Sequence, residues 1–193
     1  MAQEQREYTW QDLENAVGKD FSDGQVRWGW GPFERGYIRM FCEALEMDCP
    51  LHYNDEAART WGYKGIIAPW AGVSQAYLQN GRWLPGDPSR WGDPRSEDTL
   101  SRTRDAAGAE QPLPMPKVSG NMMAEIEVEY YRPVYVGDRI GSRGQKIISV
   151  NVRRTSIGFG AFVTTQKEVV NQDGELVAHI RTTNYRYQRE PRD

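Results

Sequence analysis

The sequence predicts an α+β domain in which an antiparallel sheet has one face covered by a helix. The last third of the chain contains four consecutive β-strand patterns, whereas the first half contains an amphipathic helix pattern. Strands joined by short turns form antiparallel sheets, and the apolar face of such a sheet must be covered. We therefore expect residues 1–193 to form one domain with one core.

The chain begins with a short helix and an edge strand. Residues 10–18 predict a helix or turn that ends at Gly18. Residues 25–30 alternate weakly between apolar and polar side chains, which favours a strand at a sheet edge.

The clearest helix is predicted over residues 33–48. Its apolar residues recur at three- and four-residue steps and so share one face, namely Tyr37 or Ile38, Phe41, Cys42 and Leu45. Pro50 disfavours a helical conformation at the residue before it, so this helix should end near Asp48.

Two further helices are predicted before the strands. Asn54 suits an N-cap position and Gly62 a helix end, which predicts a short helix between them. Pro69 suits a first turn and predicts a third helix over residues 69–80. The proline- and glycine-rich residues that follow predict a long loop insertion at about 81–122.

The remaining residues predict a four-stranded sheet. Residues 124–131 alternate strictly between glutamate and apolar side chains, as a half-buried strand does. Strands are also predicted over 140–154, 156–171 and 175–188, with a tight hairpin at Asp173-Gly174.

Composition excludes several classes of function. The net charge of -3 comes from well-mixed acidic and basic residues, so we expect no nucleic-acid partner. The longest apolar runs are too short to span a membrane, and two cysteines do not form a disulfide framework, so we expect a cytoplasmic protein. No second His stands at ligand spacing from His52, so no metal and no cofactor are predicted.

His52 is the first of only two histidines and stands in a Pro-Leu-His turn after Asp48. An imidazole in such a turn can transfer protons near neutral pH. The same position is also compatible with a side chain that caps a helix or binds a carbonyl group. The second histidine, His179, lies in an alternating strand and is predicted to be an ordinary strand residue.

Three segments resemble the MaoC-like family of acyl-thioester dehydratases and hydratases, in particular its FAS1-like or N-terminal-half branch. They are Pro-Leu-His-Tyr-Asn-Asp-Glu-Ala-Ala at 50–58, Gly-Tyr-Lys-Gly-Ile-Ile-Ala-Pro at 62–69 and Tyr-Arg-Pro-Val-Tyr-Val-Gly-Asp at 131–138. The resemblance implies a hot-dog fold, in which the sheet wraps a long central helix, here 69–80. It also implies an acyl-CoA or acyl carrier protein thioester as ligand, and a homo- or hetero-oligomer with another MaoC-like chain.

The resemblance also implies an active site. Catalytic members carry an Asp, four further residues and a His, which hold the water that adds to the enoyl thioester, while an amide at the helix start polarises the thioester oxygen. This assigns His52 and Asp48 to catalysis. It assigns substrate binding to the helix start and to one nearby aromatic side chain, namely Ile67, Ala68, Pro69, Trp70, Ala71, Gly72 and Trp83.

The match to that pattern is partial. Met47 stands where the acid is expected, and Asp48 is one position too close to His52. Pro69 replaces the histidine of the helix start. Either Asp48 reaches the same place through a shorter loop, or this chain is the non-catalytic half of a pair whose partner supplies the acid-base residues.

The predicted function is therefore an enoyl-CoA hydratase or 3-hydroxyacyl-thioester dehydratase, or the substrate-binding subunit of a heteromeric one. Alternatives are an accessory subunit without catalytic residues, a pure binding module and a hot-dog acyl-CoA thioesterase. Thioesterases commonly use a carboxylate on the central helix, and residues 69–80 contain none.

Overall fold

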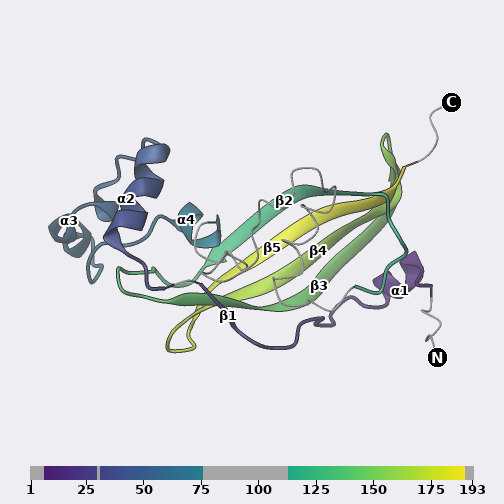
Figure 1. The fold of residues 1–193 in the computed structure, drawn as a ribbon, viewed down its shortest axis with the longest axis horizontal. Helices are drawn as coiled ribbons and strands as arrows, with labels where there is room; N and C mark the ends of the chain where they lie inside the picture. The colour runs from purple at the N-terminus through teal and green to yellow at the C-terminus, as the bar shows by residue number, and fades with distance from the viewer. Residues whose placement is uncertain (1–6, 30, 76–112, 190–193) are drawn as a thin grey trace, which may run out of the picture.

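The computed structural model describes residues 7–29, 31–75 and 113–189, and it confirms the predicted α+β class. One antiparallel sheet has the strand order β1-β3-β4-β5-β2. Its strands are β1 (Arg27–Trp28), β2 (Gly120–Tyr130), β3 (Ile140–Thr155), β4 (Gly158–Asn171) and β5 (Leu176–Gln188). The helices are α1 (Trp10–Glu14), α2 (Arg35–Ala44), η1 (Pro50–His52), α3 (Asp55–Thr60) and α4 (Trp70–Gln75). Helices α2, α3 and α4 gather near one end of the sheet, and α1 lies near the other (Figure 1).

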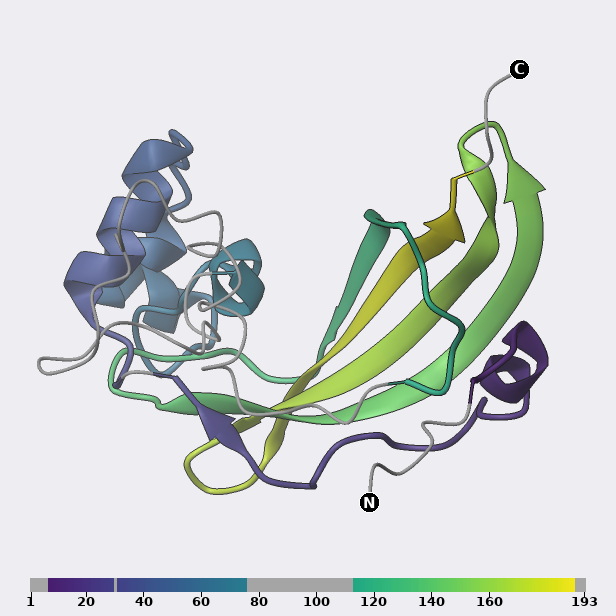
Figure 2. The same ribbon diagram turned by 45° about the vertical axis from the view of Figure 1, so that its right-hand side comes forward.

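The sheet is strongly curved, with α4 on its concave side (Figure 2). Strands β3, β4 and β5 form the middle of the sheet, β1 is a short edge strand as predicted, and β2 is the other edge. The hairpin between β4 and β5 is also as predicted, and Gly174 there has the positive φ of 78° that glycine adopts without strain.

Two predicted elements extend beyond the described residues. The predicted helix over 69–80 is described as α4 only, and residues 76–80 lie outside the described residues. Most of the predicted loop insertion, 81–122, also lies outside them. Strand β2 begins at Gly120, earlier than the start at Ala124 that its alternation predicted.

Helix α2 is shorter than predicted. It ends at Ala44 instead of near Asp48, because Glu46 adopts a left-handed backbone with a φ of 52°. This closes a Schellman turn in which the Met47 amide donates to the Cys42 carbonyl at 2.9 Å. The polypeptide therefore leaves the helix before it reaches the residues that precede His52.

The buried face of α2 is narrower than its sequence pattern predicted. Ile38 and Cys42 are fully buried, and Phe41 is half-buried. Leu45 is 57% exposed and Tyr37 is 43% exposed, so the prediction that Leu45 is a core residue was wrong. Leu45 follows the last turn of the helix, where the backbone no longer directs side chains along the same face.

One face of the sheet carries two apolar clusters. The first joins the helices to the sheet around the α4 residue Val73 and includes Phe33, Ile38, Cys42, Ile66, Ala68, Val134, Ile140, Val169, Val177 and Ala178. The second lies beneath α1 and includes Leu13, Ala16, Leu113, Ile147, Ala161 and Val163. The first cluster holds the helical segments against the sheet and thereby positions the site described below.

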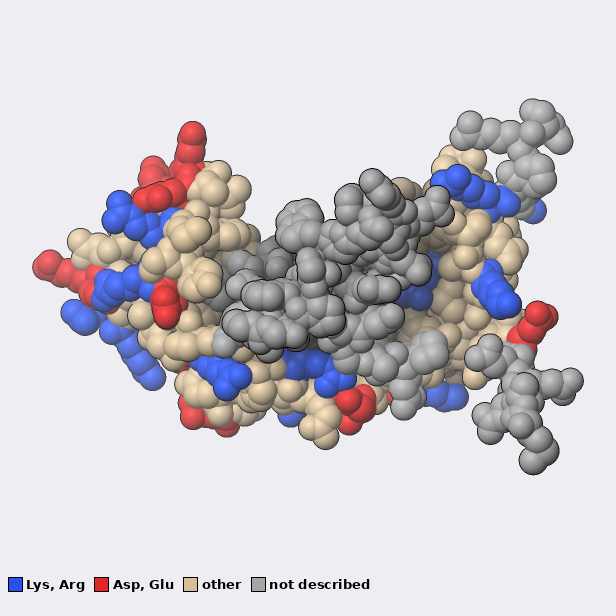
Figure 3. All heavy atoms as spheres, in the orientation of Figure 1, with Lys and Arg blue, Asp and Glu red and all other residues tan. Residues whose placement is uncertain are grey.

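The opposite face of the sheet carries stacked aromatic rings at one end, namely Phe162, Tyr185 and Tyr187, and is polar at the other end. Arg143, Glu168, His179 and Glu129 are register partners across β3, β4, β5 and β2. The Tyr131 hydroxyl lies 3.0 Å from Nδ1 of His179. Acidic and basic side chains are also interspersed over α2 and α3 in Figure 3. None of the helices described here combines the length and the hydrophobicity that crossing a membrane requires.

Candidate functional site

His52 ends the short η1 helix between α2 and α3. The Asn54 side chain caps α3, as predicted, by accepting hydrogen bonds from the amides of Glu56 and Ala57 at 2.8 and 3.2 Å. The η1 helix on one side and the capped start of α3 on the other therefore restrict the backbone at His52.

The imidazole of His52 is buried, with 8% of the residue exposed. Its Nδ1 lies 2.9 Å from the carbonyl oxygen of Ile67, which can only accept, so Nδ1 carries the proton. The Ile67 amide in turn donates to the Leu51 carbonyl at 3.2 Å. These two hydrogen bonds tie the histidine turn to the segment that precedes α4.

The segment before α4 is held on its other side by the strand region at 131–138. The Ala68 amide donates to the Val134 carbonyl at 2.8 Å, and Ile67 forms an isolated antiparallel bridge with Tyr135. Ile67, Ala68 and Pro69 are all buried. The three segments that carry the family resemblance, 50–58, 62–69 and 131–138, thus meet in space.

The first turn of α4 is fixed by the edge strand β2. The Tyr130 hydroxyl donates to the Trp70 carbonyl, and the two rings lie 4.6 Å apart between centroids. Trp70 is half-buried, Ala71 is exposed and Gly72 is buried. The predicted substrate-binding residue Trp83 lies outside the described residues.

The residues where the acid is expected point in different directions. Met47 is half-buried and packs against the first apolar cluster. Its carbonyl accepts a hydrogen bond from the Tyr53 hydroxyl at 2.8 Å. Asp48 is exposed, and no hydrogen bond joins it to His52 in the described part of the chain. The assignment of His52 and Asp48 to catalysis therefore stays a prediction, with no direct contact between them among the described residues.

A cleft of about 610 Å³ opens beside the segment that precedes α4, between that segment, the 131–138 region and the β4–β5 hairpin. Neither His52 nor Asp48 lines it. Its lining residues are Arg35, Asp55, Lys64, Gly65, Ile66, Arg132, Pro133, Tyr135, Val136, Asp138, Asn171, Gln172, Asp173 and Glu175.

Sequence reasoning did not single out the charged residues of this cleft. Lys64 and Arg132 lie within two of the segments that carry the resemblance, and only their place in these segments could have pointed to the cleft. Arg35 was not among the predicted site residues. The described residues contain no group of three or more His, Cys, Asp or Glu side chains that could hold a metal ion.

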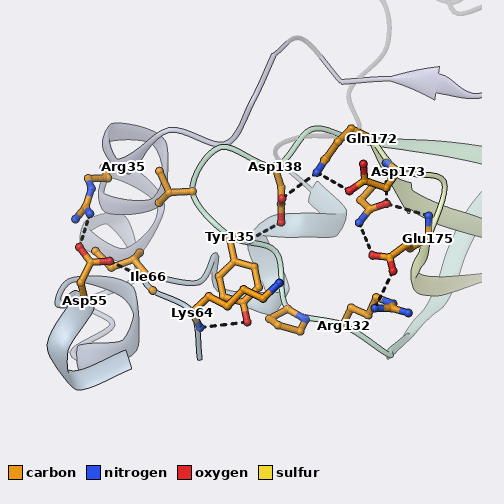
Figure 4. Close-up of a pocket in the computed structure, with 14 residues that line it drawn as sticks. Arg35, Asp55, Lys64, Ile66, Arg132, Tyr135, Asp138, Gln172, Asp173 and Glu175 are labelled. Atoms are coloured by element: carbon orange, nitrogen blue, oxygen red, sulfur yellow. Dashed lines mark hydrogen bonds and ion pairs between the residues drawn. The ribbon is translucent and has the colours of Figure 1, made fainter. Parts of the chain in front are cut away.

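Ion pairs and backbone amides hold the cleft's acidic side chains. Asp55 pairs with Arg35 and accepts from the Ile66 amide at 3.1 Å (Figure 4). The hydrogen bond from Arg35, followed by that from the Ile66 amide, lowers the pKa of Asp55 below its ordinary value. Asp55 is thus ionised near neutral pH and joins α2, α3 and the segment before α4.

Comparison with known proteins agrees with the motifs. Residues 88–180 match the family model for the FAS1-like dehydratase domain region. The chain is 27% identical over 158 residues to a protein from Thermomonospora curvata named as a probable enoyl-CoA hydratase alpha subunit. That alignment covers 80% of this chain but only 45% of the relative, so the chain spans about half of the relative's length.

Solved structures share the fold. One is the ChsH1-ChsH2 complex from Mycobacterium tuberculosis, with a TM-score of 0.64 at 21% identity, covering 95% of this chain and 91% of that one. Another is the truncated HadBC (3R-hydroxyacyl-ACP dehydratase) complex from the same organism, with a TM-score of 0.50 at 21% identity, covering 88% of this chain and 96% of that one. The curved sheet with α4 on its concave side is therefore the hot-dog fold that the motifs implied. The family match, this relative and the shared fold agree with the resemblance to MaoC-like dehydratases that the motifs carry.

Proposed function

We propose that this chain is the substrate-binding subunit of a two-chain enoyl-thioester hydratase or dehydratase, whose acid-base residues come from a second MaoC-like chain. The overall reaction is the reversible addition of water to a 2-enoyl thioester. This chain binds the acyl thioester on CoA or on an acyl carrier protein, and the partner chain activates the water.

The observation that carries this proposal is the environment of Met47 and Asp48. The position that should hold the acid is filled by a thioether that packs into the apolar cluster. The neighbouring carboxylate of Asp48 is exposed to solvent. A water molecule held between a carboxylate and an imidazole requires both groups within hydrogen-bonding distance of it. Among the described residues, the hydrogen bond of the buried His52 imidazole goes to the Ile67 carbonyl and not to a carboxylate, which supports the proposal.

In this proposal, His52 is a structural residue. Its Nδ1–H donates to the Ile67 carbonyl and so holds the segment that leads into α4. The residues from Ile67 to Gly72 then present the start of α4 to the thioester, with Trp70 braced by Tyr130. Trp83 remains a proposed contact to the acyl group.

The proposal of a partner has independent support. Two structures with the same fold are named as two-chain complexes, and the curated relative is named as an alpha subunit. In addition, β2 is an edge strand whose Met122, Met123 and Ile126 are 50%, 58% and 39% exposed. Apolar side chains along an open strand edge suit a protein partner.

The decisive experiment compares the purified chain with its reconstituted complex. The partner to test is a MaoC-like chain with the Asp, four residues, His spacing, sought first in the neighbouring reading frame. We expect the chain alone not to hydrate a panel of 2-enoyl-CoA substrates and the mixture to do so. We also expect replacement of the histidine in the partner's motif to abolish the activity.

The opposite pattern would establish that this chain is itself the catalyst. If the chain alone hydrates enoyl-CoA and a folded His52→Asn variant loses that activity, the accessory role is wrong. Release of free CoA from saturated acyl-CoA would instead indicate a thioesterase. Both products are measured in the same assay by following the enoyl absorbance and the free thiol.

A further inference from the structure

The cleft beside the segment that precedes α4 contains basic side chains whose hydrogen-bond donors are only partly used. Three basic and four acidic side chains line it, which gives a formal charge of -1. The acidic side chains, however, are engaged within the protein. Asp138 accepts from the Tyr135 amide at 2.8 Å and from Gln172 at 3.2 Å. Glu175 accepts from Arg132 at 3.1 Å and from Asn171 at 3.0 Å.

The basic side chains retain most of their donors. Arg35 and Arg132 each use one nitrogen in an ion pair and are 59% and 52% exposed. The Lys64 ammonium lies 5.9 Å from the centroid of the Tyr135 ring and has no carboxylate partner among the described residues. In Figure 4, the Lys64 side chain extends toward the side of the cleft where Arg132 lies, whereas Arg35 lies with Asp55 at the other side. A ligand beside Lys64 therefore meets cationic donors from Lys64 and Arg132.

The cleft adjoins, along the chain, the segment that leads into the proposed thioester site. Lys64, Gly65 and Ile66 line it, and the next residue, Ile67, receives the His52 hydrogen bond. Three residues of extended chain span about 10 Å. A ligand with its reactive group at the start of α4 could thus extend a polar end into the cleft.

We propose that this cleft binds a phosphate group at the distal end of the acyl carrier arm, with Lys64 as the central contact and Arg132 on the same side of the cleft. The inference rests on the proposed function, because it takes the acyl thioester as the ligand. Phosphate oxygens only accept, and cationic donors bind them with charge-assisted hydrogen bonds. The phosphate belongs either to CoA or to the phosphopantetheine of a carrier protein.

The test is calorimetric titration of the full chain in its complex with the MaoC-like partner. The probes are octanoyl-pantetheine, octanoyl-4′-phosphopantetheine, octanoyl-CoA and an octanoyl carrier protein. We expect the phosphate-bearing thioesters to bind at least tenfold more tightly than octanoyl-pantetheine, and this advantage to fall as salt is raised. Tighter binding of octanoyl-CoA than of the phosphopantetheine thioester assigns the site to CoA, and tighter binding of the carrier protein assigns it to that carrier.

Variants locate the phosphate. Lys64→Met keeps the aliphatic stem and removes the charge, and we expect it to weaken octanoyl-CoA about tenfold while leaving octanoyl-pantetheine unchanged. Lys117→Met is the matched control, because Lys117 is also exposed but lies at the opposite end of the sheet. Arg132→Gln should act in the same direction as Lys64→Met.

The outcomes separate this inference from the proposed function. If octanoyl-pantetheine binds and phosphate adds no affinity, the phosphate site is refuted while the proposed function stands. If phosphate adds affinity that Lys64→Met and Arg132→Gln do not reduce, the phosphate binds elsewhere. If none of the thioesters binds, both proposals fail.

Discussion

Replacement of His52 tests whether its imidazole holds the structure together. The His52→Ala change removes the donor to the Ile67 carbonyl, which is itself in a buried residue. A buried acceptor left without a partner costs about 1–3 kcal/mol, and the volume lost from a buried side chain adds to this. We expect His52→Ala to lower the free energy of unfolding by about 2–4 kcal/mol.

The measurement is urea unfolding followed by the fluorescence of the chain's tryptophans. A change in the transition midpoint with an unchanged slope reports stability alone. His52→Asn should lie between wild type and alanine, because its side-chain amide can still donate to the carbonyl but fills less space. His179→Ala is the control, since the other histidine lies on the polar face and should cost less than about 1 kcal/mol.

Two results would contradict a structural role for His52. If His52→Ala unfolds at the same urea concentration as wild type, the hydrogen bond to Ile67 contributes nothing and the imidazole is not a structural residue. If the same variant also abolishes hydration by the reconstituted complex, His52 is catalytic instead. A stability loss with activity retained in the folded His52→Asn complex would support the accessory role.

The remaining predictions concern the sheet, the helices α2 and α4, and the cleft. Gly160→Ala should destabilise the chain by more than about 2 kcal/mol in urea unfolding, because an added Cβ would lie 2.1 Å from a carbonyl oxygen of β5. A Cβ added at Gly36 in α2 would have no neighbouring atom within 4 Å, so Gly36→Ala should raise the free energy of unfolding by up to about 1 kcal/mol. Equal effects of Gly160→Ala and Gly36→Ala would contradict this. Tyr130→Phe should cost about 1 kcal/mol through its lost hydrogen bond to α4, and an unchanged thermal midpoint would argue against that bond. Asp55 has a lowered pKa in the folded chain, so its contribution to stability is present above its unfolded pKa of about 3.9 and is lost as pH falls towards the folded value. The free energy of unfolding of Asp55→Asn should therefore fall less steeply with decreasing pH than that of the wild type. Parallel curves for the two proteins below the unfolded pKa would refute this.

The fold class and most elements could be predicted from local patterns. Alternation predicted the strands, Asn54 predicted the cap of α3, and Asp173-Gly174 predicted the hairpin. Each of these depends on residues within a few positions of one another. The end of α2 was less accessible, because it depends on a left-handed conformation at Glu46, which is uncommon for a side chain other than glycine.

The candidate site was predictable only in part. Motif spacing identified His52 and the start of α4, and it showed that the acid was displaced. It could not show that Met47 packs into the core while Asp48 is exposed, because the direction of each side chain follows from where α2 ends. It also missed the cleft around Lys64, whose walls come from segments more than a hundred residues apart.

Local sequence patterns predicted the strands, the cap, the hairpin and the resemblance to a family, because periodicity, capping and motif spacing act over short distances along the chain. Only the tertiary structure decided that His52 binds the carbonyl of Ile67, that three separate segments meet at the start of α4, and that a donor-rich cleft opens beside them. These features arise when the apolar cluster draws distant segments together, so their geometry depends on the packing of the whole domain.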